Sequence, residues 1–168
     1  MTTTPTIRSA SPVDAARICA IYNHYVTTTT VSFEEAPVGE ADMAGRMADV
    51  ASAGLPWLAL DVDGQLVGYA YATKWRVRAA YRHSVESTVY LDPAFTGRGH
   101  GRLLYGALLD ELRKREVHLV IGGIAQPNAG SIGLHEALGF TKAAHFTEVG
   151  MKFGRWVDVG YWQLLLDQ

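Results

Sequence analysis

Three glycines at alternate positions, Gly97, Gly99 and Gly101, form the stretch of this sequence best suited to hold a ligand. The residues before them, 85–91, predict a strand because β-branched and aromatic residues dominate. The residues after them, 102–115, predict a helix with leucines at helical spacing. Glycine has no Cβ to keep a ligand away from the backbone. The free amides and the positive end of the helix therefore favour an anion, most simply a phosphate.

The spacing of these glycines disfavours the two common nucleotide-binding loops. A P-loop needs a lysine after its second glycine, and none follows Gly106. The dinucleotide pattern fails because Arg102 and Leu104 occupy the positions of its third glycine. A nucleotide-binding module is thus only a third choice, which competition between CoA and ATP or NAD would test.

A second group of candidates lies in the loop at residues 74–83, immediately before the predicted strand. This loop gathers cations among aromatic rings: Lys74, Trp75, Arg76, Arg78, Tyr81 and Arg82. The planar fork of arginine matches a carboxylate or phosphinate group. We predict that Trp75, Arg76, Arg78 and Arg82 contact the substrate, the alternative being a solvated surface loop.

Composition predicts one domain over residues 1–168, with 48% apolar and 19% charged residues. The formal charge of −2 provides no electrostatic reason to expect nucleic acid or an anionic membrane as a partner. The only cysteine, Cys19, excludes an internal disulfide and is compatible with the cytoplasm. We see no signal peptide and no apolar run of about 18 residues that would span a membrane. The histidines are scattered, and Gly139 ends the one segment that begins like a zinc motif, so we expect no metal.

Periodicity predicts alternating helices and strands along the whole chain. Helices are expected from Ser11 to about Thr27, from about Gly39 to Ala53, from 102 to 115, and from Asn128 to Gly139. Strands are expected from Ile7 and at 57–60, 65–71, 85–91, 117–124, 146–151 and 157–166. The fold class is therefore α/β (α+β), a central mixed, twisted sheet of six or seven strands flanked by about four helices. Strands joined by a crossover helix should be parallel neighbours with a right-handed connection.

Four segments in order resemble the GCN5-related N-acetyltransferases, and within them the phosphinothricin and methionine sulfoximine acetyltransferase branch. These segments are residues 21–23, 85–90, 128–140 and 152–158. The superfamily places Arg/Gln-x-x-Gly-x-Gly/Ala between a strand and a helix, and here that motif is occupied by Thr96, Gly97, Arg98, Gly99, His100 and Gly101. Thr96 departs from the pattern, since its hydroxyl can meet a phosphate but carries no charge.

The resemblance implies an acetyl-CoA site with no metal. The glycine loop would hold the pyrophosphate, and the backbone of Val89, Tyr90 and Leu91 would pair with the pantetheine arm. One amide of that segment would stabilise the oxyanion of the tetrahedral intermediate. Asn128 and Ser131 would add CoA contacts, although a helix N-cap explains Asn128 equally well.

Two residues are candidates for proton transfer. An amine near pH 7 is mostly protonated and must lose a proton to attack a thioester. Glu86, on one strand face with Thr88 and Tyr90, is the candidate base, directly or through water; its alternative is a solvated charge or an ion pair with Arg82. His135 is the candidate acid for the leaving thiolate, its alternative being a hydrogen-bonded helix histidine. In the resembling family the loop around Phe33 walls the acceptor site.

The resemblance therefore implies an acetyl-CoA-dependent N-acetyltransferase acting on a small amino acid or analogue, of the phosphinothricin, methionine sulfoximine or methionine sulfone type. Two rivals stay open: acetylation of protein or peptide N-termini, and a non-catalytic acyl-CoA-binding domain. The resemblance also suggests a homodimer. Residues 161–166 either lie near that contact or form an inner strand.

Overall fold

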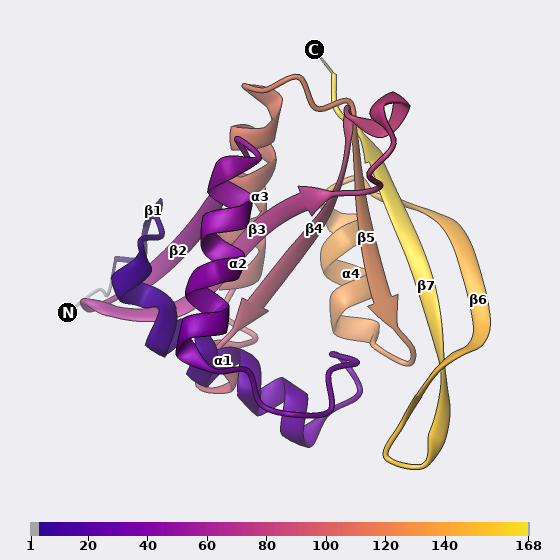
Figure 1. The fold of residues 1–168 in the computed structure, drawn as a ribbon, viewed down its shortest axis with the longest axis horizontal. Coiled ribbons are helices and arrows are strands. Elements are labelled where there is room, and N and C mark those ends of the chain that lie inside the picture. The colour runs from indigo at the N-terminus through magenta and orange to yellow at the C-terminus, as the bar shows by residue number, and fades with distance from the viewer. Residues whose placement is uncertain (1–3, 168) are drawn as a thin grey trace.

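A computed structural model describes residues 4–167 and confirms the expected fold class. Seven strands form one mixed sheet, in the order β1-β2-β3-β4-β5-β7-β6 (Figure 1). The strands are β1 (Thr6–Ser9), β2 (Trp57–Val62), β3 (Gln65–Lys74), β4 (Ser84–Leu91), β5 (Leu119–Ala125), β6 (Thr141–Lys152) and β7 (Arg155–Leu165). The α-helices are α1 (Ala15–Thr28), α2 (Glu40–Ser52), α3 (His100–Arg113) and α4 (Ala129–Ala137).

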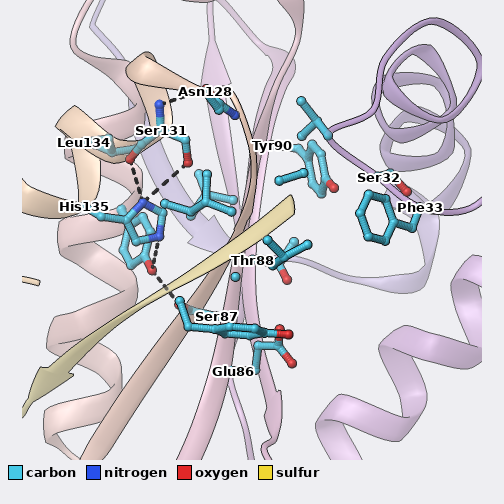
Figure 2. Close-up of a pocket in the computed structure, with 18 of the residues that line it drawn as sticks. Ser32, Phe33, Glu86, Ser87, Thr88, Tyr90, Asn128, Ser131, Leu134 and His135 are labelled. Carbon is cyan, nitrogen blue, oxygen red and sulfur yellow. Dashed lines mark hydrogen bonds between the residues drawn. The ribbon is translucent and has the colours of Figure 1, made fainter. Parts of the chain in front are cut away.

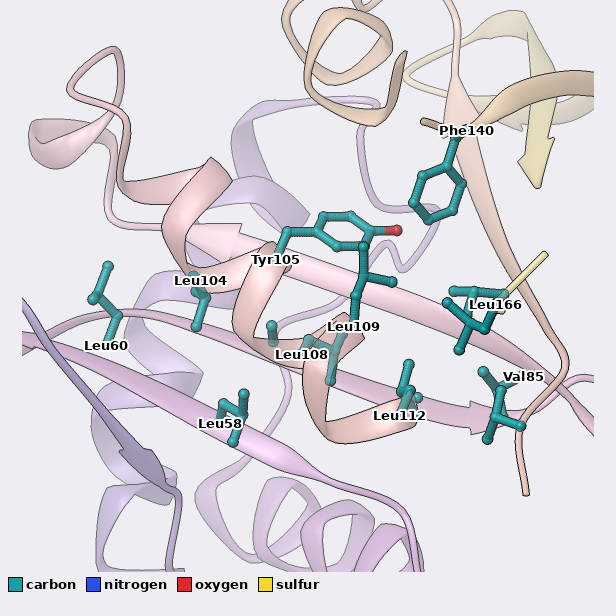
Figure 3. Close-up of a cluster of buried hydrophobic side chains, with 14 of the residues drawn as sticks. Leu58, Leu60, Val85, Leu104, Tyr105, Leu108, Leu109, Leu112, Phe140 and Leu166 are labelled. Atoms are coloured by element: carbon teal, nitrogen blue, oxygen red, sulfur yellow. The ribbon is translucent and has the colours of Figure 1, made fainter. Parts of the chain in front are cut away.

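The two faces of the sheet are covered by different helices (Figure 1). Helix α3 buries Leu104, Leu108 and Leu112 against one face, where the larger apolar core lies (Figure 3). Helices α1 and α2 cover the other face through a smaller core that includes Ile18 and Met47. Each fully buried leucine contributes about 1.5–3 kcal/mol relative to an exposed one. These two layers hold the central strands rigidly from both sides.

Strands β4 and β5 form the parallel pair that the crossover through α3 predicts. Their pairing runs only from Ser84 opposite Leu119 to Glu86 opposite Ile121, after which the strands separate. Beyond Glu86, β4 stays paired with β3 on its other side as far as Leu91. The edge of β4 that faces β5 is therefore without a strand partner from Ser87 onward.

The C-terminal strands differ from expectation in two respects. Strand β6 begins at Thr141 rather than at 146. The strands joined by α4 are not neighbours, because β7 pairs with both β5 and β6 and lies between them. Of residues 161–166, all but the last belong to β7, which is an inner strand of the sheet, one of the two expected alternatives. Trp162 and Leu166 belong to the larger core.

Two features are absent from the part of the chain that the structure describes. Over residues 4–167, none of the helices combines the length and apolar character needed to cross a membrane. The same residues hold no cluster of three or more histidine, cysteine, aspartate or glutamate side chains that could bind a metal ion.

Candidate active site

A cavity of about 460 Å³ opens where β4 and β5 separate. Most of its walls come from β4, β5, β7, α4 and the loop between α1 and α2, and single residues of α1, β3, α3 and β6 complete them. Five consecutive residues of β4, from Glu86 to Tyr90, line it, so residues of both strand faces border the cavity and not only the face shared by Glu86, Thr88 and Tyr90. Figure 2 shows His135 and Phe33 on opposite sides, with Thr88 between them. Of the site residues expected from the sequence, it is lined by Phe33, Glu86, Val89, Tyr90, Asn128, Ser131 and His135.

Glu86 lies at the point where the two strands part. Burial raises the pKa of its carboxyl group, and the charge of Arg76 partly opposes that shift. A Cβ at Gly123 would lie 3.4 Å from Glu86 Oε1, so the carboxylate packs closely against the β5 backbone. Among residues 4–167 the carboxylate forms no ion pair, and Arg82 donates instead to the carbonyl of Ala79. A half-buried, unpaired carboxylate is a suitable proton acceptor.

The arginine loop lies next to the cavity only through its beginning, where Trp75 contacts a lining residue without lining the cavity itself. The guanidinium of Arg76 lies 4.8 Å from the ring centroid of Trp75. Trp75 in turn contacts Tyr161, a cavity-lining residue, with the ring centroids 5.7 Å apart. Arg78 and Arg82 are exposed and outside the lining, around the short 3-10 helix Ala79–Tyr81. None of these four residues lines the cavity: Trp75 packs on the lining residue Tyr161, and Arg76 acts on Glu86 through its charge. Arg78 and Arg82 lie farther along the loop.

His135 belongs to a buried hydrogen-bond chain (Figure 2). Its Nδ1 lies 2.7 Å from the carbonyl oxygen of Ser131, which only accepts, so Nδ1 carries the proton. Nε2 then accepts from the hydroxyl of Tyr105, at 3.1 Å. The Tyr105 hydroxyl also lies 2.5 Å from Ser87 Oγ on β4. Burial lowers the pKa of His135, which favours the neutral ring. This is the hydrogen-bonded helix histidine that the sequence left as an alternative, and the acid role stays a prediction.

The glycine loop has the backbone conformation that its sequence requires. Gly97 and Gly99 have φ of 72° and 81°, in the left-handed region, and α3 begins directly afterwards at His100. A Cβ at Gly101 would lie 3.4 Å from Leu134 and 3.6 Å from Leu91. The loop is therefore next to the cavity, because Leu134 lines the cavity and Leu91 is the last residue of β4.

The polar side chains near this loop are partly engaged within the protein. The Thr96 hydroxyl donates to the carbonyl of Pro93, and His100 Nδ1 donates to that of Phe95. The guanidinium of Arg98 lies 5.5 Å from the Phe95 ring centroid. Asn128 Oδ1 accepts from the amide of Ser131, so Asn128 is an N-cap as well as a cavity residue. The first-turn amides of α3 are the main donors left for an anion.

Sequence reasoning missed Ser87, Tyr105 and Tyr161, which also line the cavity. Tyr105 lies among leucines of α3 that pattern alone assigns to the core, and it is indeed 1% exposed. Its signal was the phenolic hydroxyl, because a buried tyrosine needs a hydrogen-bond partner. Ser87 shares the inward face of β4 with Val85, and nothing in the spacing connects it with Tyr105.

Comparison with known proteins gives a consistent result. A family model described as an acetyltransferase (GNAT) domain matches residues 7–160. The chain is 44% identical over 154 residues to a phosphinothricin N-acetyltransferase of Alcaligenes faecalis, covering 91% of this chain and 78% of the relative. It is 40% identical to an L-methionine sulfoximine/L-methionine sulfone acetyltransferase of Salmonella typhimurium, covering 97% and 95%. A solved GNAT superfamily phosphinothricin acetyltransferase from Sinorhizobium meliloti, in complex with acetyl-CoA, superposes with a TM-score of 0.93 at 36% identity, covering 99% and 89%.

Proposed function

Because the chain belongs to the GNAT acetyltransferase family, we propose that it transfers the acetyl group of acetyl-CoA to the amino group of a small amino acid or analogue. Phosphinothricin, methionine sulfoximine and methionine sulfone represent this acceptor class. The observation that carries the proposal is the unpaired carboxylate of Glu86 at the point where β4 and β5 separate, inside a cavity next to the glycine loop. The names of the relatives support the acceptor class.

The residues present fit acetyl-CoA. The pyrophosphate would meet the amides that follow Gly97 and Gly99 at the start of α3, where the helix dipole favours negative charge. The pantetheine arm would pair with the free edge of β4 along Val89, Tyr90 and Leu91. Asn128 and Ser131 face this arm from the start of α4. Arg98 supplies a cation close to the phosphates, which offsets the missing charge at Thr96.

The chemistry needs three proton transfers, and one carbon–nitrogen bond forms as one carbon–sulfur bond breaks. Glu86, directly or through water, takes a proton from the acceptor ammonium. The amine nitrogen then attacks the thioester carbonyl, and a backbone amide of β4 stabilises the oxyanion. The nitrogen loses its second proton to solvent, and the carbon–sulfur bond breaks as the amide forms. We propose that His135, once solvent has protonated Nε2, acts as the acid through Tyr105: Nε2 gives its proton to the phenolic oxygen as the phenolic proton passes to the leaving thiolate. In the neutral resting state Nε2 instead accepts from that hydroxyl. Solvent then returns a proton to His135 and accepts the proton held by Glu86.

The acceptor would occupy the end of the cavity between Glu86 and Phe33. Arg76 is the cation that influences Glu86, and its guanidinium suits the carboxylate or phosphinate of the acceptor. Arg78 and Arg82 would contact the acceptor only if the loop at 74–83 folds inward when substrate binds.

Release of the CoA thiol tests this function. Purified protein is mixed with acetyl-CoA and each of phosphinothricin, methionine sulfoximine and methionine sulfone, with a peptide panel in parallel. We expect steady thiol release with the amino acids. If the CoA thiol is released only with peptides, the acceptors are peptides and not free amino acids. If the protein binds CoA but releases no thiol with either panel, it is an acyl-CoA-binding domain.

We further propose a cytoplasmic homodimer. Large apolar side chains of the β6–β7 hairpin are exposed: Phe146, Val149, Met151, Phe153 and Trp156. Strand β6 is also an edge strand of the sheet. Contiguous apolar surface on an edge strand favours association with a second copy. The single free cysteine suits the reducing cytoplasm.

A further inference from the structure

The loop between α1 and α2 supplies one wall of the cavity but contains no regular secondary structure. It runs from residue 29 to 39 and includes Ser32 and Phe33. Ser32 is 5% exposed, whereas Phe33 is 40% exposed and lines the cavity opposite His135 (Figure 2). A loop of this kind needs contacts from elsewhere to keep an aromatic ring in place.

The first such contact is with Gly150 of β6. A Cβ at position 150 would lie 2.3 Å from Cε2 of Phe33 and 2.6 Å from Cζ. Real Cβ atoms do not approach other atoms so closely, so the ring occupies space that only glycine leaves free. The pairing of β6 with β7 shifts register between Phe146 and Gly150, and Glu148 has a φ of 52°. This irregularity carries the β6 backbone under the ring.

The second contact is the ammonium group of Lys152, two residues farther along β6. Lys152 is 1% exposed, and its Nζ donates to the carbonyls of Val26, at 2.7 Å, and Ser32, at 2.6 Å. Val26 lies in the last turn of α1, where the helix dipole favours a cation. The ammonium forms no ion pair within residues 4–167. A buried charge held by two carbonyls is costly and fixes geometry, here that of the residue preceding Phe33.

A third group holds the other side of the same loop. Glu34 accepts two hydrogen bonds from Arg46 of α2, at 2.6 and 3.0 Å, and one from Tyr22 of α1. The Tyr22 hydroxyl also bonds Ser32 Oγ, at 2.8 Å. Residues on both sides of Phe33 are therefore fixed, and Gly150 determines where its ring rests.

We propose that Gly150 and Lys152 are positioning residues for the acceptor: Gly150 seats the ring of Phe33, and Lys152 fixes the adjoining Ser32, so that strand β6 sets the shape of the acceptor end of the cavity. This inference rests on the proposed function and deepens it. The ring lines the cavity opposite α4, at the end where we place the acceptor (Figure 2). Neither residue contacts the glycine loop, so acetyl-CoA binding should not depend on them.

Substitutions at 150 and 152 test the proposal. Gly150→Ala displaces the ring by about an ångström, and misplacement on that scale costs up to about 100-fold in rate. We expect the acceptor KM to rise by about 10-fold or more, with the KM for acetyl-CoA unchanged. Lys152→Met should likewise raise the acceptor KM and leave the KM for acetyl-CoA unchanged, because the carbonyls of Val26 and Ser32 lose their donor. Gly45→Ala is the matched control, since a Cβ at that position of α2 meets nothing within 4 Å.

A double-mutant cycle distinguishes seating of the ring from general damage to β6. If Gly150 acts through Phe33, Gly150→Ala should have no further effect on acceptor KM in a Phe33→Ala background. An equal effect in both backgrounds, or an equal rise in the KM for acetyl-CoA, overturns the inference. A crystal structure of Gly150→Ala gives an answer independent of activity: a displaced Phe33 ring supports the inference and an unmoved ring overturns it. A wild-type protein silent on the amino-acid panel would instead overturn the proposed function.

Discussion

Glu86 is the residue on which the proposed chemistry depends most, and its environment gives a directional pH prediction. Burial raises its pKa above the ordinary value of an exposed glutamate, about 4.3. The base form is present above that raised pKa and is lost as pH falls through it. We therefore expect kcat to fall as the pH is lowered. The apparent pKa of this fall should be higher than that of an exposed glutamate.

Glu86→Gln should lower kcat by on the order of 10²-fold or more, the usual contribution of a general base. It should also remove the acidic limb of the kcat profile, while acetyl-CoA binding measured by calorimetry stays unchanged. Asp110→Asn, on the exposed side of α3, is the matched control for loss of a carboxylate. An unchanged rate in Glu86→Gln would eliminate Glu86 as the base.

His135 and Tyr105 should act as one unit, because they share a hydrogen bond. We expect Tyr105→Phe and His135→Gln each to lower kcat by about 10-fold or more, and the double variant to be no slower than either. The expected non-additivity is what coupled partners show in a double-mutant cycle. A large loss in His135→Gln with none in Tyr105→Phe would mean that the imidazole meets the thiolate directly. Thermal unfolding of each variant checks that the buried network has not simply lost stability.

At the scale of the element, the glycine loop makes a prediction about the cosubstrate. Gly99 has φ of 81°, and an alanine in the left-handed region costs roughly 1–2 kcal/mol. Its Cβ would also stand between the backbone and a phosphate. We expect Gly99→Ala to weaken acetyl-CoA binding by about 10-fold or more, since each 1.4 kcal/mol is tenfold, with acceptor KM little changed. Calorimetry with CoA measures this directly.

Gly106→Ala is the control for that substitution. Gly106 is inside α3, and a Cβ there meets nothing within 4 Å. Alanine is a better helix former than glycine by about 1 kcal/mol, so this variant should bind CoA normally and unfold at a higher temperature. Equal CoA affinity in wild type and Gly99→Ala would contradict the pyrophosphate role of the loop.

Elements with strong periodicity could be predicted from the sequence, and those without it could not. Helix α3 and strand β4 were evident because their buried faces repeat at the helical and strand periods. The first half of β6 was missed because Thr141, Lys142 and His145 give it no apolar pattern, whereas Phe146, Val149 and Met151 mark the second half although they too are exposed. The place of β7 between β5 and β6 follows from tertiary pairing, which no local pattern encodes.

The same distinction applies to the site. Glu86 and the glycine loop are local in sequence, so alternation and spacing identified them. The contacts of Phe33 with Gly150, and of Tyr105 with Ser87, join segments far apart in the chain. Proximity in sequence can also mislead. Arg82 is close to Glu86 in the chain, but its guanidinium donates to the carbonyl of Ala79 and forms no ion pair with that carboxylate.

At the scale of the whole molecule, the β6–β7 hairpin borders the cavity and is also the surface where we propose that a second copy binds. Val149 is 56% exposed and also lines the cavity, and Gly150 beside it seats Phe33. A second copy covering this hairpin would therefore bury apolar surface next to the acceptor end. If the homodimer forms there, assembly and acceptor binding should change together.

Charge placed on the hairpin tests this. Trp156 is 59% exposed and pairs with Met151 across the hairpin. Trp156→Glu would place a carboxylate in the proposed contact, where an unpaired buried charge is strongly unfavourable. Sedimentation should show wild type at twice the mass of the 18.3 kDa chain and the variant shifted toward one chain, with an increase of about 10-fold or more in the dimer dissociation constant. Val13→Glu, at a position 87% exposed and far from the hairpin in sequence, should leave the dimer intact. A wild type that sediments as a single chain at micromolar concentration, with full activity, would exclude the dimer and make the apolar hairpin a surface for another partner.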